Sequence, residues 1–173
     1  GVASTAMGID TKASGNYSTA MGRETIASGD YSTAMGWDTE ASAVWSTAIG
    51  PRSTANGSRS TAMGYITTAS GTASTAIGSS TTASGDHSTA MGYKTIANGA
   101  YSTAMGGFIK AKGLYSFGIG LDWINDSITA NNTMAIMGGK VGIGTVSPSK
   151  TLYVEGSAGG SQGWNASSDA RLK

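Results

Sequence analysis

The sequence has no cysteine, one histidine and only 12% charged residues, and each scarcity excludes a class of chemistry. Without cysteine there are no disulfides, no structural thiolate metal sites and no cysteine nucleophiles. The single histidine, His87, has no His or Cys companions for a zinc site, so we predict no metal and no cofactor. The net charge of +1 gives no electrostatic basis for binding nucleic acid or acidic lipid.

Long apolar runs are also missing. No stretch approaches the roughly 20 apolar residues that span a bilayer, and no secretory signal pattern is present. Residues 1–3 align with residues 15–17 of the repeat described below, so the chain opens in the middle of a repeat. We therefore expect a fragment of a longer protein, in which a missing signal or anchor means little, and we predict no membrane contact from this fragment.

The sequence is rich in glycine and in repetition. It contains 27 glycines, and the motif Ser-Thr-Ala-Met-Gly at residues 18–22 or a near copy of it recurs every 14 residues without a slip. A second piece, Ala-Ser-Gly or a relative, lies between the copies, and a weakened ninth copy of the motif begins at Ser116. The clear copies begin at Ser4, Ser18, Ser32, Ser46, Ser60, Ser74, Ser88 and Ser102. A fixed period is the signature of a repeat architecture.

A period of 14 residues with two glycines suits short strands better than a helix. Because side chains alternate along a strand, Thr19 and Met21 point one way, while Ser18, Ala20 and Gly22 point the other. Each repeat then makes one coil of two short strands, turned at the glycines, which we expect to supply positive φ angles at the corners. Stacked coils form parallel sheets, so we predict an all-β parallel β-solenoid.

Two columns of the stacked coils contain only alanine, which indicates a space one methyl group wide inside each coil. Ala20, Ala27 and Ala62 are therefore predicted to lie in the interior. The columns comprise Ala6, Ala20, Ala34, Ala48, Ala62, Ala76, Ala90 and Ala104, and Ala13, Ala27, Ala41, Ala55, Ala69, Ala83, Ala97 and Ala111.

A third column alternates only methionine and isoleucine. If alanine fills the interior, this column forms an apolar stripe on the outside of a thin rod, which is an aggregation hazard or an interface. We interpret it as an interface of a self-associating protein with cyclic symmetry. The reverse assignment, with Met and Ile inside and Ala at the subunit contact, stays open. The column comprises Met7, Met21, Met35, Ile49, Met63, Ile77, Met91, Met105 and Ile119.

The motif Ser-Thr-Ala-Met/Ile-Gly, followed by x-x-Thr/Ser-x-Ala-Ser/Asn-Gly, resembles the 14-residue head repeat of YadA-like trimeric autotransporter adhesins over residues 1–120. The resemblance implies a left-handed parallel β-roll, a homotrimer, and adhesion to a host or environmental surface molecule such as a matrix protein or glycan. It also implies a cell-surface or extracellular location. This chain departs from the family in having Thr where Val is frequent, and Met more often than Ile.

The period fails after residue 120, and we predict a cap or neck at residues 121–140, within which residues 132–139 form one last irregular coil. Residues 141–167 read as two short strands around a Ser-Pro turn and resemble the connector of phage tail-fibre-type proteins. Residues 168–173 resemble the start of the intramolecular chaperone domain of endosialidases and tail spikes, which trimerises and cuts itself off. That resemblance implies Ser168 as nucleophile and Lys173 as base, and a virion tail fibre as an alternative location.

Aromatic residues recur just before and just after the motif. Two such columns are candidates for gripping a sugar or an extended polymer by stacking. We favour the simpler interpretation that they cover coil corners and wedge between subunits, because cross-strand aromatic ladders commonly stabilise sheets. The candidates for ligand binding are Tyr17, Tyr31, Trp37, Trp45, Tyr65, Tyr93 and Tyr101.

Two other functions compete with adhesion. Threonine columns at Thr19 and at Thr25 and their equivalents resemble the arrays of ice-binding solenoids, although Thr19 shares its face with Met21. A passive spacer without a ligand is the second alternative. We predict no enzymatic activity in the repeats, because no nucleophile–base pair recurs; self-cleavage at Ser168–Asp169 is expected only when the complete chaperone domain follows.

Overall fold

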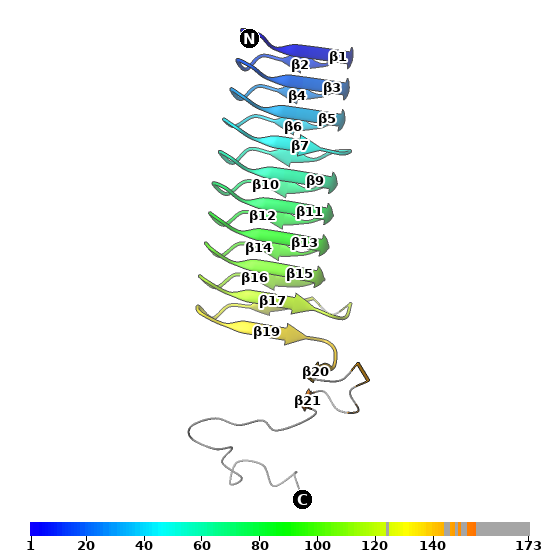
Figure 1. The fold of residues 1–173 in the computed structure, drawn as a ribbon, viewed down its shortest axis with the longest axis vertical. Coiled ribbons are helices and arrows are strands. Elements are labelled where there is room, and N and C mark those ends of the chain that lie inside the picture. Colours follow the sequence, from blue (N-terminus) through cyan, green and yellow to red (C-terminus); the bar gives the residue numbers. More distant parts are fainter. Residues whose placement is uncertain (124, 144–145, 148, 150–151, 155–173) are drawn as a thin grey trace, which may run out of the picture. The chain divides into compact units, whose positions relative to one another are not determined.

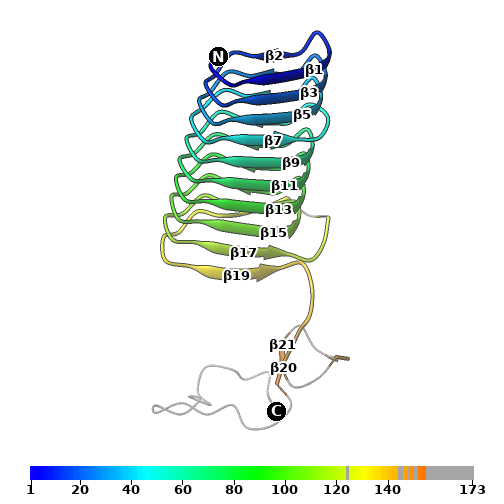
Figure 2. The same cartoon turned by 45° about the horizontal axis from the view of Figure 1, so that its top comes forward.

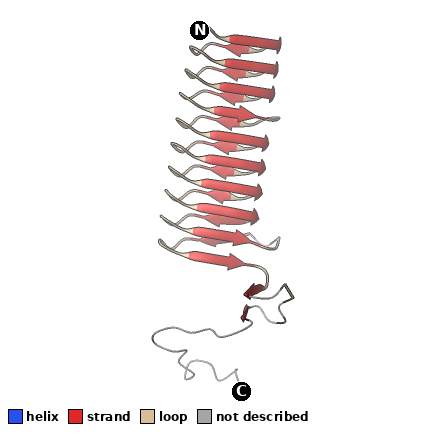
Figure 3. Ribbon diagram, viewed as in Figure 1, coloured by secondary structure: helices blue, strands red, loops and turns tan. Residues whose placement is uncertain are grey.

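The computed structural model describes residues 1–123, 125–143, 146–147, 149 and 152–154. The chain forms two units, residues 1–138 and residues 139–173. All the regular structure in the described residues is strand (Figure 3). Accordingly, none of these residues belongs to a helix with the length and hydropathy needed to cross a bilayer.

The first unit is a stack of coils, each made of one longer and one shorter strand (Figure 1). The longer strands form a ten-stranded sheet, here called the long-strand sheet. In order these are β1 (Thr5–Ile9), β3 (Thr19–Arg23), β5 (Thr33–Trp37), β7 (Thr47–Ile49), β9 (Thr61–Tyr65), β11 (Thr75–Ser79), β13 (Thr89–Tyr93), β15 (Thr103–Gly107), β17 (Phe117–Gly120) and β19 (Met134–Met137).

The shorter strands form a nine-stranded sheet, the short-strand sheet, on the other side of each coil (Figure 2). These are β2 (Lys12–Ala13), β4 (Ile26–Ala27), β6 (Glu40–Ala41), β8 (Thr54–Ala55), β10 (Thr68–Ala69), β12 (Thr82–Ala83), β14 (Ile96–Ala97), β16 (Ile109–Ala111) and β18 (Asp126–Ile128). All neighbouring strands pair in parallel, with Thr19 opposite Thr33 and Ala27 opposite Ala41. The predicted all-β parallel β-solenoid is confirmed.

The interior of the coils is made of alanine, serine and threonine. From Ala20 to Ala111 the alanines of both columns are fully buried, at 0% exposure. Ser18 and Thr25 and their equivalents fill the remaining interior positions, and the Ser18 hydroxyl donates a hydrogen bond to the Gly15 carbonyl oxygen at 2.7 Å. Of the two assignments left open by the sequence, the structure has alanine inside and the Met/Ile column on the outer face of the long-strand sheet.

The expectation that glycine supplies the positive φ angles at the corners is right for one glycine of each regular coil and wrong for the other. Residues other than glycine also have positive φ at the corners, such as Tyr17 and Glu24, with φ of 56° and 55°. Gly22 does have a positive φ, 127°, but Gly29 does not. Gly29 is needed for space instead, because a Cβ there would overlap the carbonyl oxygen of Ala43 in the next coil.

The period changes once within the first unit. Ile109 of β16 pairs with Asp126 of β18, a spacing of 17 residues instead of 14, so the additional residues lie between Gly120 and Asp126. After them, β18 and β19 extend both sheets by one more coil, within the stretch predicted as a cap or neck. The interior there is more aliphatic, since Ile109 and Ile128 are both buried.

The second unit contains two short strands in its described part, β20 (Val141–Ile143) and β21 (Leu152–Val154). They pair in parallel, with Val141 opposite Leu152. Two short strands were predicted in this region. The predicted chaperone start, with Ser168 and Lys173, lies outside the described residues.

The narrow interior leads to a stability prediction at Ala62, which is fully buried between Ala48 and Ala76. Changing Ala62→Leu should lower the free energy of unfolding by about 1–3 kcal/mol, because the added carbons have no space. The control is Ser70→Leu, at an exposed position after β10. Chemical denaturation measures both, and equal unfolding midpoints for Ala62→Leu and the parent protein would refute the interior assignment.

Candidate functional site

The outer face of the long-strand sheet carries a continuous apolar stripe, here called the Met/Ile stripe. It consists of Met7, Met21, Met35, Ile49, Met63, Ile77, Met91, Met105 and Ile119, which lie opposite one another in successive strands. Met63 is 38% exposed, and most of the others are half-buried. Thr19 and its equivalents flank the stripe and are also half-buried in most coils. No described part of the chain covers this face fully.

The second threonine column does not reach the surface. Thr25, Thr39, Thr67, Thr81 and Thr95 are at most 1% exposed, because they point into the coils. The Thr39 hydroxyl, for example, donates a hydrogen bond to the Gly50 carbonyl oxygen at 2.6 Å. This column therefore offers no surface to ice.

One corner of the solenoid carries aromatic rings that stack on one another. Tyr17 and Tyr31 stack with ring centroids 5.1 Å apart, and Tyr31 and Trp45 with centroids 5.9 Å apart. The Arg59 guanidinium then lies 5.1 Å from the Trp45 ring centroid, in a cation–π contact that extends the stack by one coil. We call this series and its continuation the corner ladder.

The corner ladder is interrupted at Ala73 and resumes in the next coil. His87 and Tyr101 stack at 4.9 Å, and Tyr101 and Tyr115 at 4.8 Å. Because neighbouring rings cover each other's faces, the ladder presents mainly ring edges and hydroxyl groups to its surroundings. Ring-on-ring packing agrees with the interpretation that these residues stabilise the corner, and their role in ligand binding stays a prediction.

The other aromatic column lies at the ends of the longer strands. Trp37, Tyr65 and Tyr93 end β5, β9 and β13, and all three are exposed. Tyr93 packs edge-on against Phe108 with ring centroids 5.3 Å apart, and Trp123 contacts the Phe108 ring at 5.2 Å. Together Tyr93, Phe108 and Trp123 form an aromatic cluster where the 14-residue period is broken.

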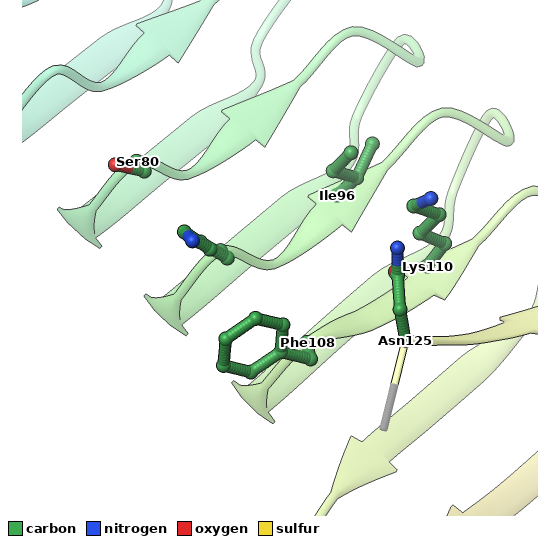
Figure 4. A pocket seen from close by; sticks show the side chains of 6 residues that line it. Ser80, Ile96, Phe108, Lys110 and Asn125 are labelled. Carbon is green, nitrogen blue, oxygen red and sulfur yellow. The ribbon is translucent and has the colours of Figure 1, made fainter. Parts of the chain in front are cut away.

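A hollow of about 320 Å³ lies beside this cluster. We call it the Phe108 hollow. It is lined by Ser80, Lys94, Ile96, Phe108, Lys110 and Asn125, of which all but Lys94 are labelled in Figure 4. The residues come from corners and strands of successive coils, and they comprise two lysines, two apolar side chains and two neutral polar side chains.

Sequence reasoning missed the Phe108 hollow. Its lysines belong to different columns, and each column holds other residue types in other coils, so no repeat pattern marks them. The one available signal was the failure of the period after Gly120, since a repeat protein builds irregular features where the repeat ends. Acidic residues do not form a comparable group, because among the described residues no three His, Asp or Glu side chains are placed to hold a metal ion.

These features define a fibrous parallel β-solenoid of 14-residue coils with an apolar stripe along one face. A family model for the YadA head domain repeat, two copies long, matches overlapping stretches from residue 1 to residue 108, more than half of the 173 residues. The stretches are 1–25, 17–39, 27–53, 41–65, 55–81, 69–95 and 83–108. The chain therefore belongs to the YadA head repeat family.

Membership of this family implies an adhesin-like surface fibre, in agreement with the predicted cell-surface location. None of the curated proteins matches the chain. The match ends before the neck, so the resemblances to a tail-fibre connector and to a chaperone domain stay predictions.

The gap in the corner ladder gives a second stability prediction. Ala73 has φ of 53°, close to the 56° of Tyr17 and Tyr101, so a tyrosine fits the same backbone there. Changing Ala73→Tyr places a ring between Arg59 and His87 and should raise the free energy of unfolding by about 0.5–1.5 kcal/mol over Ala73→Leu. The leucine variant adds a side chain at the same φ without a ring. Thermal unfolding of the two variants measures the difference, and no gain for tyrosine would contradict ring stacking as a stabilising contact.

Proposed function

We propose that this chain forms the head of a homotrimeric surface fibre that attaches to a host or environmental surface molecule, a matrix protein or a glycan. The observation that carries the proposal is the Met/Ile stripe, which runs the length of a YadA-type solenoid and is left partly exposed by the single chain.

The physical case for association starts from the thin coil. Its interior holds mainly methyl and hydroxyl groups, so a single chain buries little apolar surface for its length. The largest flexible apolar side chains lie outside instead, in one straight row. Such a row favours a cyclic assembly in which each chain presents the same face to a shared axis. The number three comes from the family resemblance.

Attachment by such a head depends on repetition more than on one deep site. Three identical chains present every exposed feature three times, and simultaneous engagement raises the overall affinity above that of each contact. The candidate contacts are the exposed aromatics Tyr17, Tyr31, Trp37, Trp45, Tyr65, Tyr93 and Tyr101.

The C-terminal part of the proposal rests on sequence resemblance. We expect residues 141–167 to connect the head to a chaperone domain that starts at residue 168. Cleavage at Ser168–Asp169 would then release the mature fibre in the complete protein, with Ser168 as nucleophile and Lys173 as base. This arrangement fits a bacterial surface fibre and a virion tail fibre alike.

The oligomeric state is tested by placing a charge on the stripe. Ile77→Glu should convert the trimer into monomers at micromolar concentration, because a carboxylate buried in an apolar contact is costly. The control is Thr82→Glu on the short-strand sheet, where Glu40 already occupies the equivalent position in β6. Sedimentation equilibrium measures the mass. A monomeric parent protein, or a trimer in both variants, would sink the assignment of the stripe as the interface.

Adhesion is tested with the soluble trimer on arrays of matrix proteins and glycans. We expect binding that is retained by the Thr82→Glu control and lost by Ile77→Glu, since the monomer loses the gain from three simultaneous contacts. A trimer that leaves both arrays blank would favour the passive spacer.

A further inference from the structure

The Phe108 hollow lies at the one place where the first unit departs from its 14-residue spacing. The residues added between Gly120 and Asp126 include Trp123, which is 77% exposed and rests against Phe108 and Tyr93. The regular coils that precede Gly120 in the chain contain no such insertion. The hollow is therefore a local addition to a uniform rod.

The charge of the hollow is positive and held in place. The Lys94 ammonium lies 5.3 Å from the Tyr93 ring centroid and 5.2 Å from the Phe108 ring centroid. Two cation–π contacts restrict its position more than a free surface lysine would be restricted. Lys110 of β16 is half-buried at the same hollow, and among the described residues neither ammonium group pairs with a carboxylate.

The remaining walls fit a ring that carries hydroxyl groups. Phe108 and Ile96 provide apolar surface, while Ser80 and Asn125 provide hydrogen-bonding groups (Figure 4). A volume of about 320 Å³ is at the lower end of the range for small-molecule sites, about 300–1,000 Å³. One sugar ring suits this space, whereas a lone phosphate or sulfate would leave the apolar wall without contact.

We propose that the Phe108 hollow binds an acidic sugar ring. Its carboxylate lies between the Lys94 and Lys110 ammonium groups, its apolar edge lies against Phe108 and Ile96, and its hydroxyls bond to Ser80 and Asn125. The inference names a ligand class for the proposed adhesin and rests on that proposed function for its biological meaning. Binding itself needs only the folded solenoid.

The test is a titration of the soluble chain with glucuronate, galacturonate and N-acetylneuraminate, followed by nuclear magnetic resonance. At least one acid should bind, and the methyl ester of glucuronic acid should bind at least roughly tenfold more weakly, because it keeps the ring and loses the charge. Raising the salt concentration should weaken the binding of the acid and leave the ester unchanged. Failure of all three acids to bind overturns the proposal.

Matched variants locate the site. Lys94→Gln and Lys110→Gln should each weaken acid binding roughly tenfold. Arg52→Gln and Lys12→Gln are the controls, because Arg52 and Lys12 occupy the corner and strand columns of Lys94 and Lys110 in distant coils. Thermal unfolding of each variant confirms that it folds. Equal loss in the control variants would mean general charge attraction and would refute the site.

Two competing ligands test whether the hollow is specific for an acidic sugar. Inorganic phosphate or an acidic pentaglutamate peptide that binds as tightly as the sugar acids would overturn the proposal in favour of a general anion site or a peptide site. Array results judge the proposed function independently. A trimer that leaves the arrays blank yet binds glucuronate through Lys94 would refute adhesion and keep the site. A trimer that binds the arrays while none of the three acids binds in the titration would keep adhesion and refute the site.

Discussion

The structure depends on how closely one coil lies on the next. Backbone hydrogen bonds such as that from the Thr19 amide to the Ser32 carbonyl oxygen, at 2.9 Å, link every coil to its neighbour. Each coil is also flat, because its two strands are separated only by the side chains of the alanine, serine and threonine columns. At Gly29 even a methyl group would strike the next coil. The size of the interior, and not its hydrophobicity, limits which residues the inward-facing positions can hold.

This limit decides where the apolar side chains lie. In a globular domain methionine and isoleucine fill the core, but here they lie on the outer face of the long-strand sheet because the interior admits little beyond a methyl or hydroxyl group. Only in the last coils, where Ile109 of β16 and Ile128 of β18 are buried, does the interior accept larger aliphatic groups. Hydrogen bonds and small side chains form the coil, and the external stripe takes no part in its interior.

The fold could be predicted from the sequence because the constraint repeats. The same position recurs in eight coils, so the alanine-only columns and the Met/Ile column could be recognised, and alternation along the strand placed the Met/Ile column on the face opposite the Ala20 column. Alanine is the favoured interior residue, and the structure decides between the two assignments. The left-handed φ angles at corner residues such as Tyr17 and Glu24 could not be predicted, since residues other than glycine rarely adopt them. The Phe108 hollow could not be predicted from the sequence for a related reason. It depends on the spacing of one unrepeated loop, about which the regular coils carry no information.

The parallel register has a consequence for how such a fibre evolves. Each regular coil pairs with the next coil in the same register in which it pairs with the previous one. Thr5 lies opposite Thr19, and Thr19 lies opposite Thr33. Duplication or deletion of 14 codons therefore changes the length of the solenoid by about 4.8 Å for each event and leaves the pairing of the other coils unchanged. Selection can adjust the length of such a surface fibre in small, uniform steps without redesigning the backbone pairing between coils.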